Sequence, residues 1–168
     1  VITSFTSHPQ PTDSVTVITN LDKDMVSNST ILSTAWDGTK DIPITSTAYA
    51  YLTSTKVYDS LGSAHDITIY YDKITNAEWE YILSCNPAED LRRGLAGTEA
   101  AGLLARGEIS FDEINGTITG ITMSRLTGSD DWTVLTSNDF NTDGYPEFMA
   151  DFLGGTATTQ EIALDMGI

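Results

Sequence analysis

The segment Asp139–Gly144, with the sequence D-F-N-T-D-G, carries residue types that readily bind a metal ion. Side-chain oxygens of Asp139, Asn141 and Asp143 alternate along it. In a calcium-binding loop such oxygens converge on the cation, while the glycine allows a sharp turn. The twelfth position of that pattern is Ala150, where a bidentate glutamate is needed. Two interpretations follow, a calcium site and a polar β-turn, and the turn is favoured.

His65 and Asp66 are the neighbouring side chains best suited to acid–base chemistry. Catalysis would need a second preorganised group, and the other histidine, His8, lies in a proline-flanked lead-in. We expect His65 to occupy a turn or strand and to hydrogen-bond Asp59 or Ser60. The sequence therefore predicts no catalytic residues, no enzyme activity and no cofactor.

Three tryptophans, Trp36, Trp79 and Trp132, fit either a carbohydrate-binding platform or a β-sheet core. Aromatic side chains contribute much of the buried area of a core, so the core is favoured. A secreted β-sandwich module that binds carbohydrate or calcium remains the alternative to the function described below.

The chain is strongly acidic, with 24 acidic against 8 basic residues and a formal net charge of −16. A field of this sign repels phosphate backbones and anionic lipid, so we expect neither nucleic-acid nor membrane binding. The single cysteine, Cys85, excludes an internal disulfide, and we expect a buried thiol at a strand end. The first residue is Val1, not methionine, which favours a fragment of a longer chain.

Alternating apolar and polar residues, many of them β-branched, predict a series of short strands. The clearest is a three-stranded antiparallel meander from Tyr51 to Cys85. A long loop is expected over 21–41, and the only helix over Thr98–Ala105. The expected fold is all-β, an antiparallel flattened barrel or sandwich with at most one short helix. The expected strands are 15–19, 53–59, 65–71, 78–83, 107–112, 117–123, 132–136, 147–153 and 161–165.

The meander resembles a motif of bacterial flagellar hook proteins, in which a V-Y-D-S-x-G turn and a histidine precede a tyrosine-ending strand, a lysine and a tryptophan-containing strand. Segments similar to the family also occur at 19–22, 109–118 and 162–165. The sequence departs from the family at Tyr71, where phenylalanine is usual, and over 86–106, which resembles an insertion. The motif residues are Tyr58, Asp59, Ser60, Gly62, His65, Tyr70 and Trp79.

The resemblance implies a structural subunit that self-assembles with other copies into the hook, the flexible tube that transmits torque from rod to filament. It also implies export through the flagellar type III apparatus and an extracellular location in the bacterial flagellum. The full-length protein would contact rod, hook cap and hook–filament junction proteins. Residues 1–40 would be a lead-in strand and loop, partly belonging to an adjoining inner β domain. Residues 41–168 would form the outer hook β domain.

The resemblance gives Lys73 and Cys85 a second interpretation. Spirochaete hook proteins join neighbouring subunits through a lysinoalanine link made from a cysteine and a lysine, and these two residues are the candidates for it. Assembly in this family depends mainly on terminal helices that are absent from this sequence. We therefore expect the 168-residue chain to be monomeric in light scattering.

Overall fold

Two β-sheets hold most of the regular structure in residues 7–155 and 159–167, which the computed structural model describes. The larger sheet has the order β2-β3-β4-β5-β7-β8, with β6 pairing to β5 beside this path, and its pairs are antiparallel. Its strands are β2 (Tyr51–Tyr58), β3 (Ala64–Lys73), β4 (Glu78–Ser84), β5 (Leu103–Phe111), β6 (Ile118–Ile121), β7 (Ser124–Gly128) and β8 (Asp131–Val134). The smaller sheet has the order β1-β10-β9, from β1 (Ser14–Thr16), β10 (Gln160–Asp165) and β9 (Glu147–Ala150).

Side-chain alternation explains how the larger sheet buries both of its faces. Ile67, Ile69 and Tyr71 of β3 point to one side, because successive side chains of a strand alternate, and all three are buried. In β4, Trp79 is buried on that same side and Ile82 on the other. The centre of the sheet is therefore covered twice.

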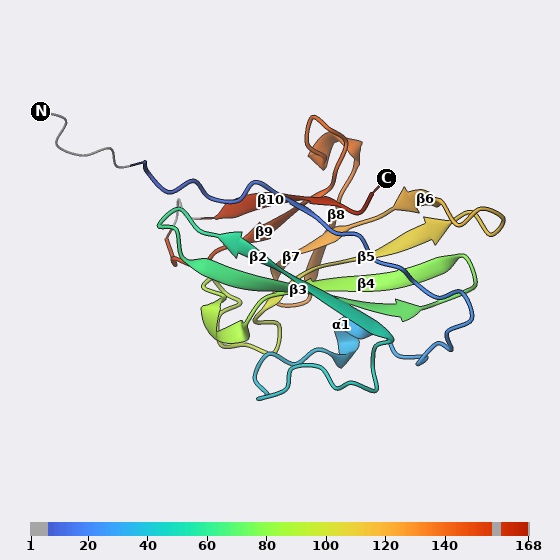
Figure 1. Ribbon diagram of the computed structural model, residues 1–168. Helices are drawn as coiled ribbons and strands as arrows, with labels where there is room; N and C mark the ends of the chain where they lie inside the picture. Colours follow the sequence, from blue (N-terminus) through green and yellow to red (C-terminus); the bar gives the residue numbers. More distant parts are fainter. Residues whose placement is uncertain (1–6, 156–158, 168) are drawn as a thin grey trace, which may run out of the picture.

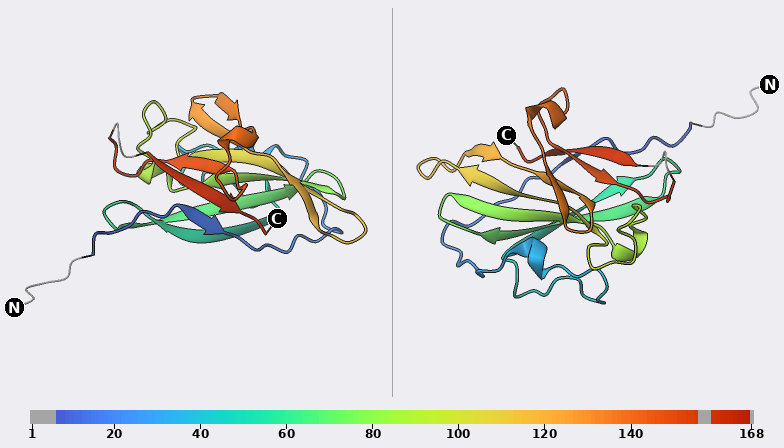
Figure 2. Two further views of the ribbon diagram at one scale, coloured as in Figure 1. Left: turned by 90° about the horizontal axis from the view of Figure 1, so that it is seen from above. Right: turned by 180° about the vertical axis from the view of Figure 1, so that it is seen from behind.

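The larger sheet is the middle of three layers, as Figures 1 and 2 show. The small sheet lies over one face, and Phe148 and Ile162 join the core between the two sheets. Residues 27–49, here named the cover segment, lie over the other face and contain the one-turn helix α1 (Leu32–Ala35). Neither sheet closes on itself. The all-β expectation is confirmed in its sandwich form.

Trp36 fixes the cover segment from within a stretch that the sequence assigned to a loop. It is buried beside Leu32 and Ile82, and its Nε1 donates a hydrogen bond to the carbonyl of Ala101 at 2.9 Å.

Within the described ranges, no helix is long and apolar enough to cross a membrane.

A row of carboxylates also holds the cover segment. Asp72, Glu80 and Glu108 lie directly opposite one another on β3, β4 and β5. Asn28 donates its backbone N–H and its Nδ2 to Asp72 at 3.0 and 2.8 Å, and Leu32 N donates to Glu80 at 3.3 Å. Burial above all, then the charges of Asp72 and Glu108, raises the pKa of Glu80 to about 7, although the Leu32 N–H opposes this.

Replacing Glu80 by glutamine is expected to stabilise the protein at pH 8 by roughly 1 kcal/mol, a value kept small because solvent screens a half-buried charge. The pKa of Glu80 in the folded state is raised above the ordinary 4.5. The stability contribution of the neutral carboxyl is therefore fully present below pH 4.5 and is lost as the pH rises through about 7 and the group ionises. A glutamine cannot ionise, so the variant does not lose this stability. Urea unfolding at pH 5 and pH 8 checks this; an equal gain at both pH values would contradict the explanation.

The connection between β4 and β5 differs from the predicted helix. A 3₁₀ turn (Pro87–Glu89) is followed by turns, and β5 already begins at Leu103. Gly97 and Gly102 have φ values of 74° and 80°, which break any helix that the alanines between them and the leucines after Gly102 favour. In the described part of the chain, the α-helix is instead α1, inside the predicted long loop.

A buried ion pair organises this connection. Arg92 donates from Nε and Nη2 to the two oxygens of Asp90 at 2.9 and 2.8 Å, and also to the carbonyls of Leu126 and Leu103 at 3.0 and 2.7 Å. Asp90 accepts a further bond from Gly102 N at 2.7 Å. The pair therefore connects the β4–β5 turns with the start of β5 and with β7.

Two strand pairings differ from expectation. First, β1 and β10 pair in parallel, with Val15 opposite Leu164, although the expected fold was antiparallel. Second, the predicted strand 117–123 is shorter than expected: β6 ends at Ile121, a break follows, and a separate strand, β7, begins at Ser124; both strands pair with β5. At this break the carbonyl of Thr122 lies over Gly107 and accepts a hydrogen bond from Tyr81 Oη at 2.7 Å.

Candidate functional site: the motif hairpin

The turn between β2 and β3 is built by Asp59. One oxygen of its carboxylate accepts the backbone N–H groups of Leu61 and Ser63, at 2.8 and 2.9 Å. Gly62 adopts φ 84°, a conformation that favours glycine. Ser60 is exposed at the tip of the turn. The D-S-L-G run of the motif is therefore explained by turn geometry.

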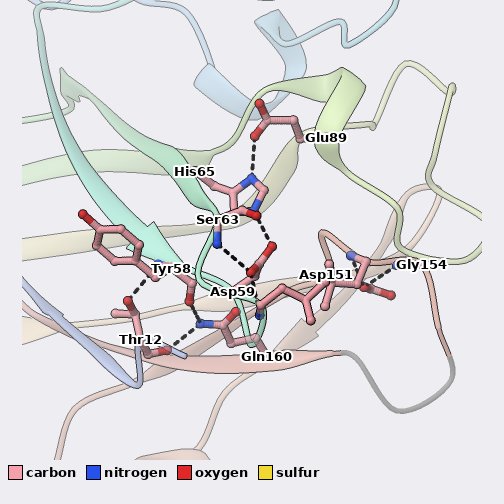
Figure 3. Close-up of polar contacts among 11 residues, drawn as sticks. Thr12, Tyr58, Asp59, Ser63, His65, Glu89, Asp151, Gly154 and Gln160 are labelled. Carbon is pink, nitrogen blue, oxygen red and sulfur yellow. Dashed lines mark hydrogen bonds and ion pairs between the residues drawn. The ribbon is translucent and has the colours of Figure 1, made fainter. Parts of the chain in front are cut away.

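His65 joins this turn to two other parts of the chain, and Figure 3 shows its contacts with Asp59 and Glu89. Its Nε2 lies 3.0 Å from the second oxygen of Asp59, and its Nδ1 lies 2.7 Å from Glu89. The imidazole stacks on Phe152 with ring centroids 3.9 Å apart and planes 5° apart. The expected contact between His65 and Asp59 is present.

The charges of this cluster favour an imidazolium. Burial by itself lowers the pKa of His65, but the hydrogen bonds and charges of Asp59 and Glu89 outweigh it and raise that pKa above 6.5. Burial likewise opposes the ionised form of Asp59, yet the bonds from His65, Ser63 and Leu61 lower its pKa below 3.8. Because both ring nitrogens face carboxylate oxygens, only the doubly protonated ring donates to both.

Replacing His65 by glutamine is expected to cost about 1–2 kcal/mol of unfolding free energy at pH 5.5, since hydrogen bonds to charged groups are lost. The loss is expected to be smaller at pH 8.5. The raised pKa makes the stability contribution of His65 fully present below pH 6.5, and this contribution disappears as the pH rises through the folded-state value. Thermal unfolding of both proteins at the two pH values measures the difference; a cost independent of pH would show that the charge is irrelevant.

The end of the hairpin is also tied to both ends of the described chain. Thr12 and Tyr58 exchange hydrogen bonds, Thr12 N to Tyr58 O and Tyr58 N to Thr12 Oγ1, each at 2.9 Å. Gln160 donates its Nε2 to the carbonyls of Thr12 and Tyr58 at 2.6 and 3.0 Å. Figure 3 shows these bonds beside the His65 cluster, so the hairpin end joins the two sheets.

This arrangement suits a structural role and not acid–base catalysis. A catalytic histidine needs one nitrogen available to a substrate, and both nitrogens of His65 are occupied. Among the described residues, no hydrogen bond connects His8 with the cluster. The same part of the chain contains no group of three or more histidine, cysteine, aspartate or glutamate residues that could hold a metal.

The remaining motif aromatics lie in the core on the two faces of the large sheet. Trp79 is 2% exposed, and its ring centroid lies 5.9 Å from that of Tyr51. Tyr70, on the opposite face, makes an edge contact with Tyr49 at 4.8 Å. Trp132 is partly buried, with the Arg106 guanidinium 4.2 Å from its ring centroid. The three tryptophans thus have neighbours within the protein.

The oxygens of the D-x-N-x-D-G loop hold local structure. Asp139, at the end of the 3₁₀ turn Ser137–Asp139, accepts the N–H and the hydroxyl of Thr136, both at 2.8 Å. Asn141 Oδ1 accepts the N–H groups of Asp143 and Tyr145 at 3.0 and 2.9 Å. These bonds account for the residue types of the segment as a turn, and the calcium assignment remains a sequence-based prediction.

The two crosslink candidates lie at opposite ends of the β3–β4 pair. Lys73 ends β3 and donates to the carbonyl of Lys23, whereas Cys85 directly follows β4. Cys85 is 4% exposed, and burial raises the pKa of its thiol to about 12. Since six strand positions at ~3.3 Å each separate the two ends, a link between them would have to join different subunits.

Four residues of the site were not predicted from sequence. Thr12, Glu89, Phe152 and Gln160 come from the lead-in, the β4–β5 connection and the two sides of the β9–β10 loop. No local pattern distinguishes them, because each meets the hairpin only through the fold. The available signal was indirect: a histidine that is buried beside a carboxylate needs a further side chain to cover its ring, and Phe152 is that side chain here.

A family model described as the flagellar basal body protein FlaE D2 domain matches residues 20–167. The chain belongs to this family. Membership confirms the resemblance to flagellar hook proteins and the prediction that the chain is not an enzyme, because the FlaE D2 family is structural. The matched range contains the hairpin, the Asp90–Arg92 pair and β10, and it begins after β1.

Solved structures similar to the chain include a 32 kDa fragment of the flagellar hook protein from Caulobacter crescentus, with 14% sequence identity and a TM-score of 0.49. The alignment covers 83% of this chain and 46% of that structure, so the chain spans less than half of its length. Among curated proteins, none matches. The family assignment therefore rests on the FlaE D2 match.

Proposed function

We propose that this FlaE D2 chain is part of the subunit of the bacterial flagellar hook, the flexible tube that transmits torque from the rod to the filament. The match of the family model to residues 20–167 carries the proposal. The subunit would assemble with further copies of itself, and its location would be the extracellular hook. Its work is mechanical.

The surface of the described domain suits contacts that must rearrange during rotation. Hydroxyl side chains such as Ser54 and Thr68, which share a 2.8 Å hydrogen bond, lie on the outward face of the β2–β3 edge. Polar contacts through water re-form at low cost when neighbours slide. The net charge of −16 also keeps crowded copies soluble.

Several finer assignments accompany this proposal. Export would follow the flagellar type III route, and the full-length protein would meet rod, hook cap and hook–filament junction proteins. Residues 41–168 would form the outer hook domain, with 1–40 leading in from an adjoining β domain. Lys73 of one subunit and Cys85 of a neighbour would be the partners for a non-reducible crosslink. A mass-spectrometric search of polymerised hooks for that linked peptide pair tests the last assignment.

Antibodies raised against the 168-residue chain test the location. Applied with gold labels to isolated hook–basal bodies, they are expected to decorate the curved hook along its length and to leave rod and filament bare. Particles from a strain in which the gene is deleted and the hook is restored with a related protein serve as the control. Labelling confined to rod, filament or cell envelope would overturn the proposal.

A further inference from the structure

The parallel pairing of β1 and β10 determines how the fold responds to a force that stretches the chain. The two strands run in parallel, Ser14 to Thr16 beside Ala163 to Asp165. In Figure 2, left, the blue arrow of β1 and the red arrow of β10 point the same way. The chain therefore enters β1 at one end of this strand pair and leaves β10 at the other.

A pull that separates these two points loads the pair in shear. It draws β1 toward its beginning and β10 toward its end, so the strands can part only by sliding along one another. The hydrogen bonds of the ladder lie across the direction of sliding and share the load. In a pair pulled apart sideways, by contrast, each bond is loaded and broken in turn.

The β1–β10 pair is extended by one hydrogen bond just before β1 and one just after it. Ala163 N donates to Asp13 O and Val17 N donates to Asp165 O, each at 2.8 Å. Because N–H and C=O groups alternate in direction along a strand, Val15 also faces β10, whereas Thr16 turns its N–H away. Val15 and Val17 are buried, so sliding must also pull two aliphatic side chains out of the core.

The bonds at the hairpin end reinforce the entry to β1. Thr12 is held by Tyr58 through a pair of 2.9 Å bonds and by Gln160 at 2.6 Å. Gln160 begins β10, so the lead-in is bonded to the same strand that the ladder holds. A pull on the lead-in must break these bonds before, or together with, the ladder.

We infer that β1, β10 and the Thr12–Tyr58–Gln160 bonds form a mechanical clamp that makes this domain resist extension along its own chain. The usefulness of such a clamp rests on the proposed function, since a torque-bearing tube loads its subunits. The clamp itself is a property of the fold, and its test does not depend on where the protein is found.

Single-molecule pulling in two directions tests the clamp. In the first, handles are fused before Val1 and after Ile168. In the second, the handle after Ile168 is replaced by one on a cysteine introduced by Glu161→Cys, an exposed position near the start of β10, so that β1 is peeled sideways. Cys85 is buried and does not compete for the handle. The force at which β1 separates is expected to be severalfold higher in the first direction; equal forces would overturn the inference.

A matched pair of proline variants tests the ladder. Val15→Pro removes an N–H that faces β10 and is expected to abolish most of the directional difference. Thr16→Pro removes an N–H that faces away and is expected to preserve it. Equal losses in both variants would show that the ladder does not carry the load. Should Val15→Pro fail to fold, the two-direction comparison on the unsubstituted ladder still decides.

Discussion

Replacing Arg92 by alanine is expected to reduce the unfolding free energy by about 3–5 kcal/mol, because it leaves the carboxylate of Asp90 buried without its partner. The side chains of Arg92 and Asp90 are 8% and 0% exposed, so water cannot replace the lost bonds. The carbonyls of Leu103 and Leu126 lose a donor as well. Urea unfolding monitored by tryptophan fluorescence gives the value.

Arg93 provides the matched control for this experiment. It is the same residue type one position later, but it is exposed. Arg93→Ala is therefore expected to change the unfolding free energy by less than about 0.5 kcal/mol. If both variants lost equal stability, the effect would belong to the net charge of the protein and not to the buried pair.

Replacing Gly107 by alanine is expected to destabilise the protein by about 3 kcal/mol, at the upper end of the range for overpacking. A Cβ at this position would lie 1.9 Å from the carbonyl oxygen of Thr122 and 2.7 Å from the hydroxyl of Tyr81. The carbonyl belongs to the backbone and cannot rotate away. The change must therefore separate β5 from the chain between β6 and β7, or break the Tyr81–Thr122 bond.

Gly120 makes the comparison selective. It lies in β6, a neighbour of β5, and a Cβ added there would have no atom within 4 Å. Gly120→Ala is expected to be neutral or to stabilise by up to about 1 kcal/mol, since alanine restricts the unfolded chain. Comparable losses at both positions would indicate a general requirement for glycine in these strands and not a local clash.

The meander was predictable because its information is local. Alternation in β3 and β4 sets the faces of Ile69 and Trp79, and Asp59 with Gly62 sets the turn between β2 and β3. The same local information is enough to connect His65 with Asp59, six residues earlier.

The predictions were wrong where contacts with segments distant in the sequence determine the local structure. The sequence around Thr98–Ala105 favours a helix by composition, but the Asp90–Arg92 pair and the glycines hold residues 98–102 in turns, and β5 begins at Leu103. The parallel β1–β10 pair joins residues about 150 positions apart, and no pattern in either strand specifies its partner or direction. Burial of Arg92 was equally hidden, because its partners are backbone carbonyls.

The two layers that cover the large sheet are unequal in construction. One is a hydrogen-bonded sheet, while the other is an irregular stretch whose attachments include the bonds of Asn28 to Asp72 and single bonds to Glu80 and Ala101. Opening the second layer breaks fewer bonds at once, so its amides should exchange with solvent earlier than those of β3 and β4. We therefore expect the domain to be stiffer on the side of the small sheet than on the side of the cover segment. Under load, the cover segment would deform first, and the strand pairing of the two sheets would stay unchanged.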